Sequence, residues 1–197
     1  MSFAPVPDGQ LAAVVTFLEM RVRPATLPIP PSPLRLERVE HPIPSAYRDL
    51  FRRVGSPWLW FSRLIMPDAD LAAILDHPAV DLFEVRDGET VVGMLELDRR
   101  DVGACELSFV GLVPEYSGKG HGRWLLAEAV SRAWGRDGVG RVHVHTCSLD
   151  HPAALAAYRR AGFVAVRRAV ETFIDPRLAG VLPRDAAPHV ALVDPSS

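Results

Sequence analysis

The sequence predicts a mixed α/β domain in which a twisted mixed β-sheet is flanked by helices. Helical and strand periodicities follow the order helices, β-hairpin, strand, and then strand–helix–strand–helix–strand. Adjacent strands followed by alternation are typical of a mixed sheet rather than of a doubly wound one. The length of 197 residues allows one such domain with a short appendage.

The first 34 residues are expected to form an extension of this domain. Residues 12–20 are apolar and β-branched, which favours a strand. The prolines that cluster after it exclude a helix or a central strand and favour an extended connection. We expect the strand either to pack onto an edge of the same sheet or to cross to a second subunit. The predicted organisation is a strand and proline-rich arm (1–34), the α/β domain (35–176) and a C-terminal tail (177–197).

The elements of the domain each have a local signal. Apolar residues recur at helical intervals from Tyr47 to Val54, and an Asp87-Gly88 pair between two alternating runs is typical of a hairpin. Pro114 stops one strand, and Gly162 closes the last helix. The expected helices are 45–54, 67–75, 122–135 and 152–161, and the expected strands are 81–86, 90–98, 104–113, 141–147 and 163–174, the last as one strand or a hairpin pair.

Composition excludes several classes of function. The chain carries 22 Lys and Arg against 24 Asp and Glu, a net charge of −2, which argues against a polyanion-binding surface built from bulk basic charge. No apolar run approaches the roughly 20 residues that span a bilayer, and the first residues lack the pattern of a signal peptide. Two cysteines make neither a disulfide framework nor a zinc site. We therefore expect a cytoplasmic protein without a metal, a nucleic-acid partner or a membrane partner.

The most informative segment is LVPEYSGKGHGR, residues 112–123. A strand ends there, three glycines alternate within the glycine loop (residues 117–122), and an amphipathic helix begins. Such glycines let several backbone N–H groups converge at a helix N-terminus, which suits a phosphate or pyrophosphate. The alternative is a tight turn without a ligand, although a turn seldom needs three glycines.

Two common phosphate-binding motifs do not match this segment. A P-loop has four residues between its first glycine and the Gly-Lys pair, but six separate Gly111 from Gly118, and a glycine follows Lys119. A dinucleotide fingerprint would need glycine where Arg123 stands.

The segment resembles the main motif of the GNAT acetyltransferase superfamily, a strand ending in Val-Pro-Glu-Tyr, then Arg or Gln, Gly-x-Gly-x-Gly and a helix. Downstream, residues 151–163 resemble the closing motif of that family, and residues 83–97 are similar to its usual hairpin. The resemblance covers residues 45–174 and implies the mixed-sheet GNAT fold. Two departures are Ser117, where the family has Arg or Gln, and His151, where it has Asn.

The resemblance implies acetyl-CoA as co-substrate, held mainly by backbone N–H groups of the glycine loop. We expect weakened rather than lost affinity from Ser117. The cofactor-binding residues that it implies are Leu112, Val113, Ser117, Gly118, Lys119, Gly120, His121, Gly122, Arg123 and His151.

The resemblance also implies direct attack of an amine on the thioester, with one group accepting a proton and another protonating the departing thiolate. Tyr158 stands at the tyrosine position of the family and is the expected general acid; a packed aromatic ring is the alternative. Glu106, in the strand before Val113, is the expected base, and an exposed strand carboxylate is the alternative. His145 is the second candidate for the base.

Trp58, Trp60 and Phe61 lie between the first two expected helices, where the family walls its acceptor pocket; with His145 they are the candidate substrate-binding residues, and core packing is the alternative. We expect an N-acetyltransferase that transfers an acetyl group to a primary amine of a small molecule or peptide. One alternative is a non-catalytic acyl-CoA-binding module acting through protein contacts, and another is a structural partner that retains the fold only. A homodimer built by the N-terminal arm is a further option that the sequence leaves open.

Overall fold

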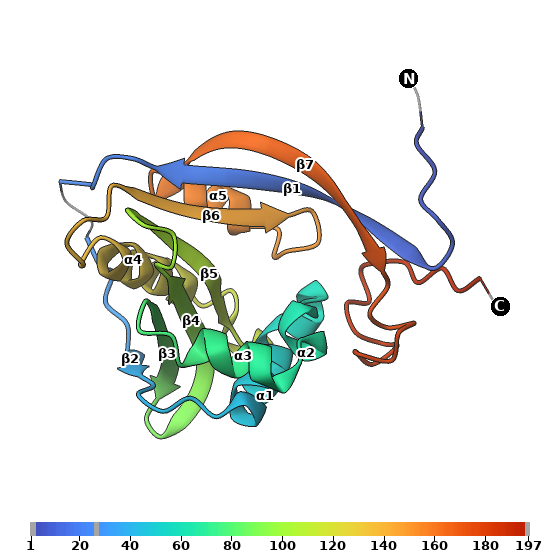
Figure 1. Cartoon of the computed structure of the whole chain (residues 1–197), viewed down its shortest axis with the longest axis horizontal. Coiled ribbons are helices and arrows are strands. Elements are labelled where there is room, and N and C mark those ends of the chain that lie inside the picture. The colour runs from blue at the N-terminus through green and yellow to red at the C-terminus, as the bar shows by residue number, and fades with distance from the viewer. Residues whose placement is uncertain (1–2, 26–27, 196–197) are drawn as a thin grey trace.

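The computed structural model describes residues 3–25 and 28–195, which form a seven-stranded mixed sheet with helices on its faces (Figure 1). The strand order is β2-β3-β4-β5-β6-β1-β7, and only β5 and β6 run parallel. This confirms the predicted fold class. The strands are β1 (Gln10–Met20), β2 (Arg35–Arg38), β3 (Val80–Asp87), β4 (Thr90–Asp98), β5 (Ala104–Leu112), β6 (Arg141–Cys147) and β7 (Val164–Ile174). The helices are α1 (Pro44–Gly55), α2 (Ser62–Ile65), α3 (Asp68–Leu75), α4 (His121–Ala133) and α5 (Ala154–Arg160), with 3-10 turns η1 (Ser56–Trp58) and η2 (Pro114–Tyr116).

Most of the expected elements are confirmed, including the β3–β4 hairpin around Asp87 and Gly88. Two short elements, β2 and α2, have four residues each and were not predicted, because so few residues carry no readable periodicity. The final segment forms the single strand β7, and its antiparallel partner is β1 rather than a second strand of a hairpin.

The N-terminal strand β1 lies inside the sheet, not at its edge. It pairs antiparallel with β6 on one side, from Val15 to Met20, and with β7 on the other side, from Gln10 to Glu19. Figure 1 shows β6, β1 and β7 as a three-stranded wing turned away from β2 to β5. The strand is therefore a structural part of the sheet that carries the candidate site.

The two halves of the sheet separate between β5 and β6. Their parallel pairing covers only three residues of each strand, and its last pair is Glu106 with His143. Beyond that pair β5 continues to Leu112 on the ladder of β4, whereas β6 continues to Cys147 on the ladder of β1. The separation opens a space between the strands without breaking the ladder on either outer side.

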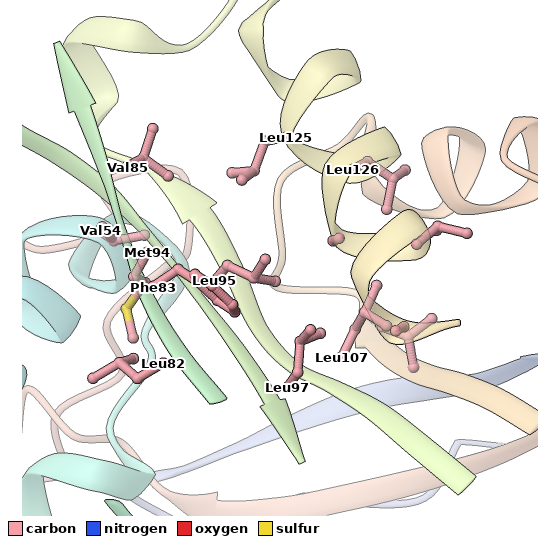
Figure 2. Close-up of a cluster of buried hydrophobic side chains, with 14 of the residues drawn as sticks. Val54, Leu82, Phe83, Val85, Met94, Leu95, Leu97, Leu107, Leu125 and Leu126 are labelled. Carbon is pink, nitrogen blue, oxygen red and sulfur yellow. The ribbon is translucent and has the colours of Figure 1, made fainter. Parts of the chain in front are cut away.

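The main hydrophobic core holds the β2–β5 half of the sheet between α4 and the helices α1 and α3. Figure 2 shows Leu125 and Leu126 of α4 on one side of these strands, and Leu95 and Leu97 of β4 among the buried side chains. The apolar face predicted for α4 is buried against the strands, and Leu125 is only 2% exposed. This packing fixes the start of α4, and with it the glycine loop.

The residues after Ile174 pack against the connection between η1 and α2 and against the start of β1. Arg177 donates to the carboxylate of Asp175 and to three backbone carbonyl oxygens of the following segment, and its side chain is almost completely buried. A second small core joins Leu59 to Leu182 and two alanines of this segment. Within the described residues, no helix has the length and apolar character required to cross a membrane.

Candidate active site

The glycine loop has the backbone geometry that its sequence predicts. Gly118 and Gly120 have φ values of +75° and +87°, a region that side-chain-bearing residues rarely adopt. Gly120 is the N-cap of α4, a helix of 13 residues. A Cβ atom at Gly118, Gly120 or Gly122 would have no heavy atom within 4 Å, so the loop faces open space. The backbone N–H groups at this helix start are therefore accessible to an anion.

A cavity of about 640 Å³ extends from this loop into the space between β5 and β6. Seven of the ten residues predicted to bind acetyl-CoA line it: Leu112, Ser117, Gly118, Gly120, Gly122, Arg123 and His151. Three do not. Val113 is buried in the core, the Lys119 amine lies over the Tyr116 ring, and His121 Nδ1 lies 3.3 Å from Ser32 Oγ.

Tyr158 lines the cavity from α5. Its ring stands edge-on to Phe163, 5.9 Å between centroids, and within the described residues its hydroxyl has no hydrogen-bond partner. Burial, and secondarily the charge of Asp150, raise the pKa of Tyr158 well above that of a free phenol. The side chain is therefore a neutral hydrogen-bond donor over the whole physiological pH range.

Glu106 and His145, which the sequence offers as alternatives for one role, form a pair. Glu106 Oε1 lies 3.2 Å from His145 Nδ1, at the point where β5 and β6 separate, and both residues line the cavity. The hydrogen bond from His145 lowers the pKa of Glu106, and the same bond raises the pKa of His145. An ionised carboxylate can only accept, so Nδ1 carries the proton and Nε2 of the neutral ring keeps a free lone pair.

The aromatic segment, Trp58 to Phe61, lies at the far end of the cavity, and its rings contact side chains from both halves of the sheet. The Trp60 indole donates to Asp150 Oδ1 at 3.1 Å, and the ring centroids of Phe61 and Phe173 lie 4.9 Å apart. Trp58 stands edge-on to His151 at 5.0 Å. All three aromatic residues predicted to bind substrate line the cavity.

His151 has a local structural role besides lining the cavity. Its Nδ1 accepts the backbone N–H of Ala153 at 3.1 Å, and its carbonyl accepts that of Ala154. These bonds shape the turn that leads into α5, and so they help to place Tyr158 on that helix.

Sequence reasoning missed Asp150 and Phe173. Asp150 accepts hydrogen bonds from Trp60, Thr146 and the backbone of Cys147, and so holds the aromatic segment against the β6–α5 turn. Its position just before a His-Pro pair and a helix is a turn signal that could have identified it. Phe173 gave no signal, because its role depends on the pairing of β7 with β1.

Two arginines on the cavity wall are neutralised by buried or partly buried carboxylates. The guanidinium of Arg63 donates to Glu96 at 2.6 Å, and Tyr47 donates to the other oxygen of this fully buried carboxylate at 2.5 Å. Arg100 is bound in the same way by Asp98. Neither arginine therefore presents an unbalanced charge to the cavity.

The glycine loop, Tyr158 and the Glu106–His145 pair line one cavity, an arrangement that suits an acyltransferase. The chain belongs to the acetyltransferase (GNAT) family, whose model matches residues 45–163, more than half of the chain.

A curated relative is the N-alpha-acetyltransferase RimI of Mycobacterium tuberculosis (strain ATCC 25618 / H37Rv), 41% identical over 107 residues, which are 52% of this chain and 65% of that protein. The chain thus matches slightly less than two thirds of this relative. Among solved structures, a GCN5-related N-acetyltransferase from Kribbella flavida has a TM-score of 0.54 at 20% identity, covering 87% of this chain and 63% of that one. A GCN5-related N-acetyltransferase from Sphaerobacter thermophilus has a TM-score of 0.57 at 20% identity, covering 85% and 52%. These two likenesses concern the fold.

Proposed function

We propose that the protein is an N-acetyltransferase that transfers the acetyl group of acetyl-CoA to a primary amine of a small molecule or peptide. The observation that carries the proposal is that one cavity joins the glycine loop to both Tyr158 and the Glu106–His145 pair. An anion site alone would fit many proteins, but this one leads directly to a proton donor and a proton acceptor.

Acetyl-CoA supplies an acyl group already activated as a thioester. Backbone N–H groups of Gly118 to Gly122 would hold its pyrophosphate at the N-terminus of α4, and Arg123 lines the cavity beside them. Ser117 stands where the family has a long polar side chain, Arg or Gln. The backbone N–H groups and the helix dipole would therefore provide most of this binding. The residues present therefore fit the co-substrate.

We assign the base to Glu106 acting together with His145. An alkyl amine is largely protonated at neutral pH, with a pKa near 10.4, so a proton must leave before or during attack. His145 receives this proton on Nε2, and Glu106 stabilises the resulting imidazolium through Nδ1. This division of roles follows from the shifts: the lowered pKa makes Glu106 a poor base by itself, whereas the raised pKa makes His145 a better one.

The second proton transfer falls to Tyr158. The amine nitrogen forms a bond to the acyl carbon, the carbon–sulfur bond breaks, and the departing thiolate takes the phenolic proton. Burial raises the pKa of Tyr158, so the phenol is neutral and carries its proton before the thiolate forms.

The similarity to a protein named as an N-alpha-acetyltransferase makes the α-amine of a peptide the first acceptor to test. The aromatic segment at Trp58 to Phe61 would form the wall of the acceptor end. A cytoplasmic location remains a prediction from the sequence.

Calorimetric titration with acetyl-CoA tests the loop. The wild type is expected to bind, and Gly120→Asp is expected to abolish binding, because it strains a positive φ and adds a negative charge at the helix start. Gly88→Asp is the matched control, since this hairpin glycine also has a positive φ and no heavy atom near its Cβ position. Equal loss in both variants, or no binding by the wild type, would refute the loop assignment. Thiol release with peptide and small amines then tests turnover, and binding without turnover would favour the non-catalytic module.

A further inference from the structure

The outer edge of β7 is long, in contrast to the opposite edge of the sheet. The β2 edge is only four residues long and offers little backbone for pairing with another strand. The β7 edge is 11 residues long, without proline or lysine, and its β-branched residues Val166, Val170 and Ile174 are 54–68% exposed. One bulge lies near its N-terminal end, opposite the step from Phe17 to Leu18 of β1, and the ladder is regular from Arg167 onward.

The sequence of β7 is complementary to itself in an antiparallel arrangement. A two-fold axis perpendicular to the sheet preserves its faces, so each residue must meet a residue of equal parity on the second strand. An axis at Ala169 places Arg167 opposite Glu171 of the partner subunit, and the symmetry repeats this pair. The smallest shift that keeps the parity is two residues, and in either direction it places Arg167 opposite an alanine or a phenylalanine instead. The charge pattern thus selects one register.

These two charges have no ion-pair partner within the described residues of their own chain. Arg167 and Glu171 are four residues apart on one strand, roughly 13 Å at the rise of an extended chain, so they cannot pair with each other there. The Arg167 guanidinium lies over the Phe17 ring, 3.8 Å from its centroid. Stacking uses the face of the guanidinium and leaves the N–H groups at its rim available to a carboxylate.

We propose that a second copy of this chain pairs antiparallel with β7 about a two-fold axis at Ala169, joining two seven-stranded sheets into one. Backbone hydrogen bonds along the edge hold the dimer, and the two Arg167–Glu171 contacts set its register. Because Glu171 also lines the cavity, the interface brings the partner's Arg167 to the rim of each site. This dimer uses the last strand of the chain, not the N-terminal arm, and it does not depend on catalytic turnover.

Sedimentation velocity of the full chain over a range of concentrations tests the proposal. Arg167→Glu and Glu171→Arg each place like charges opposite each other twice, and each is expected to weaken dimerisation about tenfold or more. The double exchange Arg167→Glu/Glu171→Arg restores both pairs and should bring the dissociation constant back to within about threefold of the wild type. Arg168→Glu is the matched control, because it changes the charge equally but faces Val170 of the partner subunit.

Each contrary result overturns a defined part of the proposal. A wild type that remains monomeric at all concentrations refutes the dimer. A dimer that neither single variant weakens places the interface elsewhere, and a double exchange that fails to restore pairing refutes the register. Far-ultraviolet circular dichroism of each variant separates these results from loss of the fold.

Discussion

Replacing Glu106 with glutamine tests how the proton acceptor works. The change keeps the shape of the side chain and its hydrogen bond to His145 Nδ1 but removes the negative charge 3.2 Å away. That charge stabilises the imidazolium, so its removal lowers the pKa of His145 toward its ordinary value of 6.5. The acidic limb of the pH profile of kcat/KM should therefore move to lower pH.

The size of the movement follows from exposure. The side chains of Glu106 and His145 are 29% and 51% exposed, so solvent screens the pair and its interaction is worth about 1 kcal/mol. That energy corresponds to about 0.7 pH unit. A base weakened by this amount lowers the plateau of kcat/KM only several-fold, whereas loss of a general base itself costs about 10²- to 10⁴-fold.

Two measurements decide the matter. Thiol release from pH 5 to 9 gives the profile, and NMR titration of the His145 ring gives its pKa without any turnover. In a His145→Gln background, Glu106→Gln should have little further effect if the carboxylate acts only through the imidazole. An unchanged His145 pKa together with a fall of about 100-fold or more in the Glu106→Gln plateau would show that the carboxylate is itself the base, and would refute this reasoning.

Three further predictions concern the acid and the stability of the walls of the site. Tyr158→Phe should lower kcat, measured by thiol release, about 10²-fold or more. The affinity for acetyl-CoA, from calorimetric titration, and the melting temperature, from scanning calorimetry, should not change, because the hydroxyl bonds to no described residue. Arg177→Met should reduce the urea-derived free energy of unfolding by about 3–5 kcal/mol, since it leaves the buried Asp175 carboxylate uncompensated, whereas Arg52→Met, which breaks an exposed pair, should cost less than about 1 kcal/mol. Burial raises the pKa of Asp175, but the hydrogen bonds and charge of Arg177 lower it by more, so the pKa is below its ordinary value. The stabilisation from this ion pair is therefore present above about pH 4 and is lost as the pH falls further. The difference in unfolding free energy between the wild type and Arg177→Met must narrow on acidification. Gly111→Ala should destabilise by about 1–3 kcal/mol in the same urea assay, because its Cβ would lie 2.6 Å from a core valine of α1.

The glycine loop was predictable because its signal is local. Alternating glycines, a preceding strand stop and a following amphipathic helix all lie within residues 112–133, and each is set by backbone conformation. The structure accordingly gives Gly118 and Gly120 positive φ values at the start of α4. The hairpin around Gly88 was predictable for the same reason.

The position of β1 was not predictable from such signals. Its apolar, β-branched residues identify a strand, but nothing in residues 10–20 specifies that the neighbours are β6 and β7, more than 100 residues away. Apolar and β-branched residues favour a strand, but they do not specify which strands pair with it. The wing that places Phe173 and His145 on one cavity wall therefore depends on pairings that only the folded chain reveals.

The same distinction explains why Glu106 and His145 looked like competitors in the sequence. They lie 39 residues apart, on two strands that pair over only three residues before separating. Had that pairing continued, the ladder would have closed the space that the cavity occupies; had it ended earlier, the two side chains would have been drawn apart with their strands. The separation of β5 and β6 thus brings the pair together at its apex and opens the room for an acyl-CoA beyond it. Local sequence supplies the chemical groups, but the length of one short ladder decides whether they act as one.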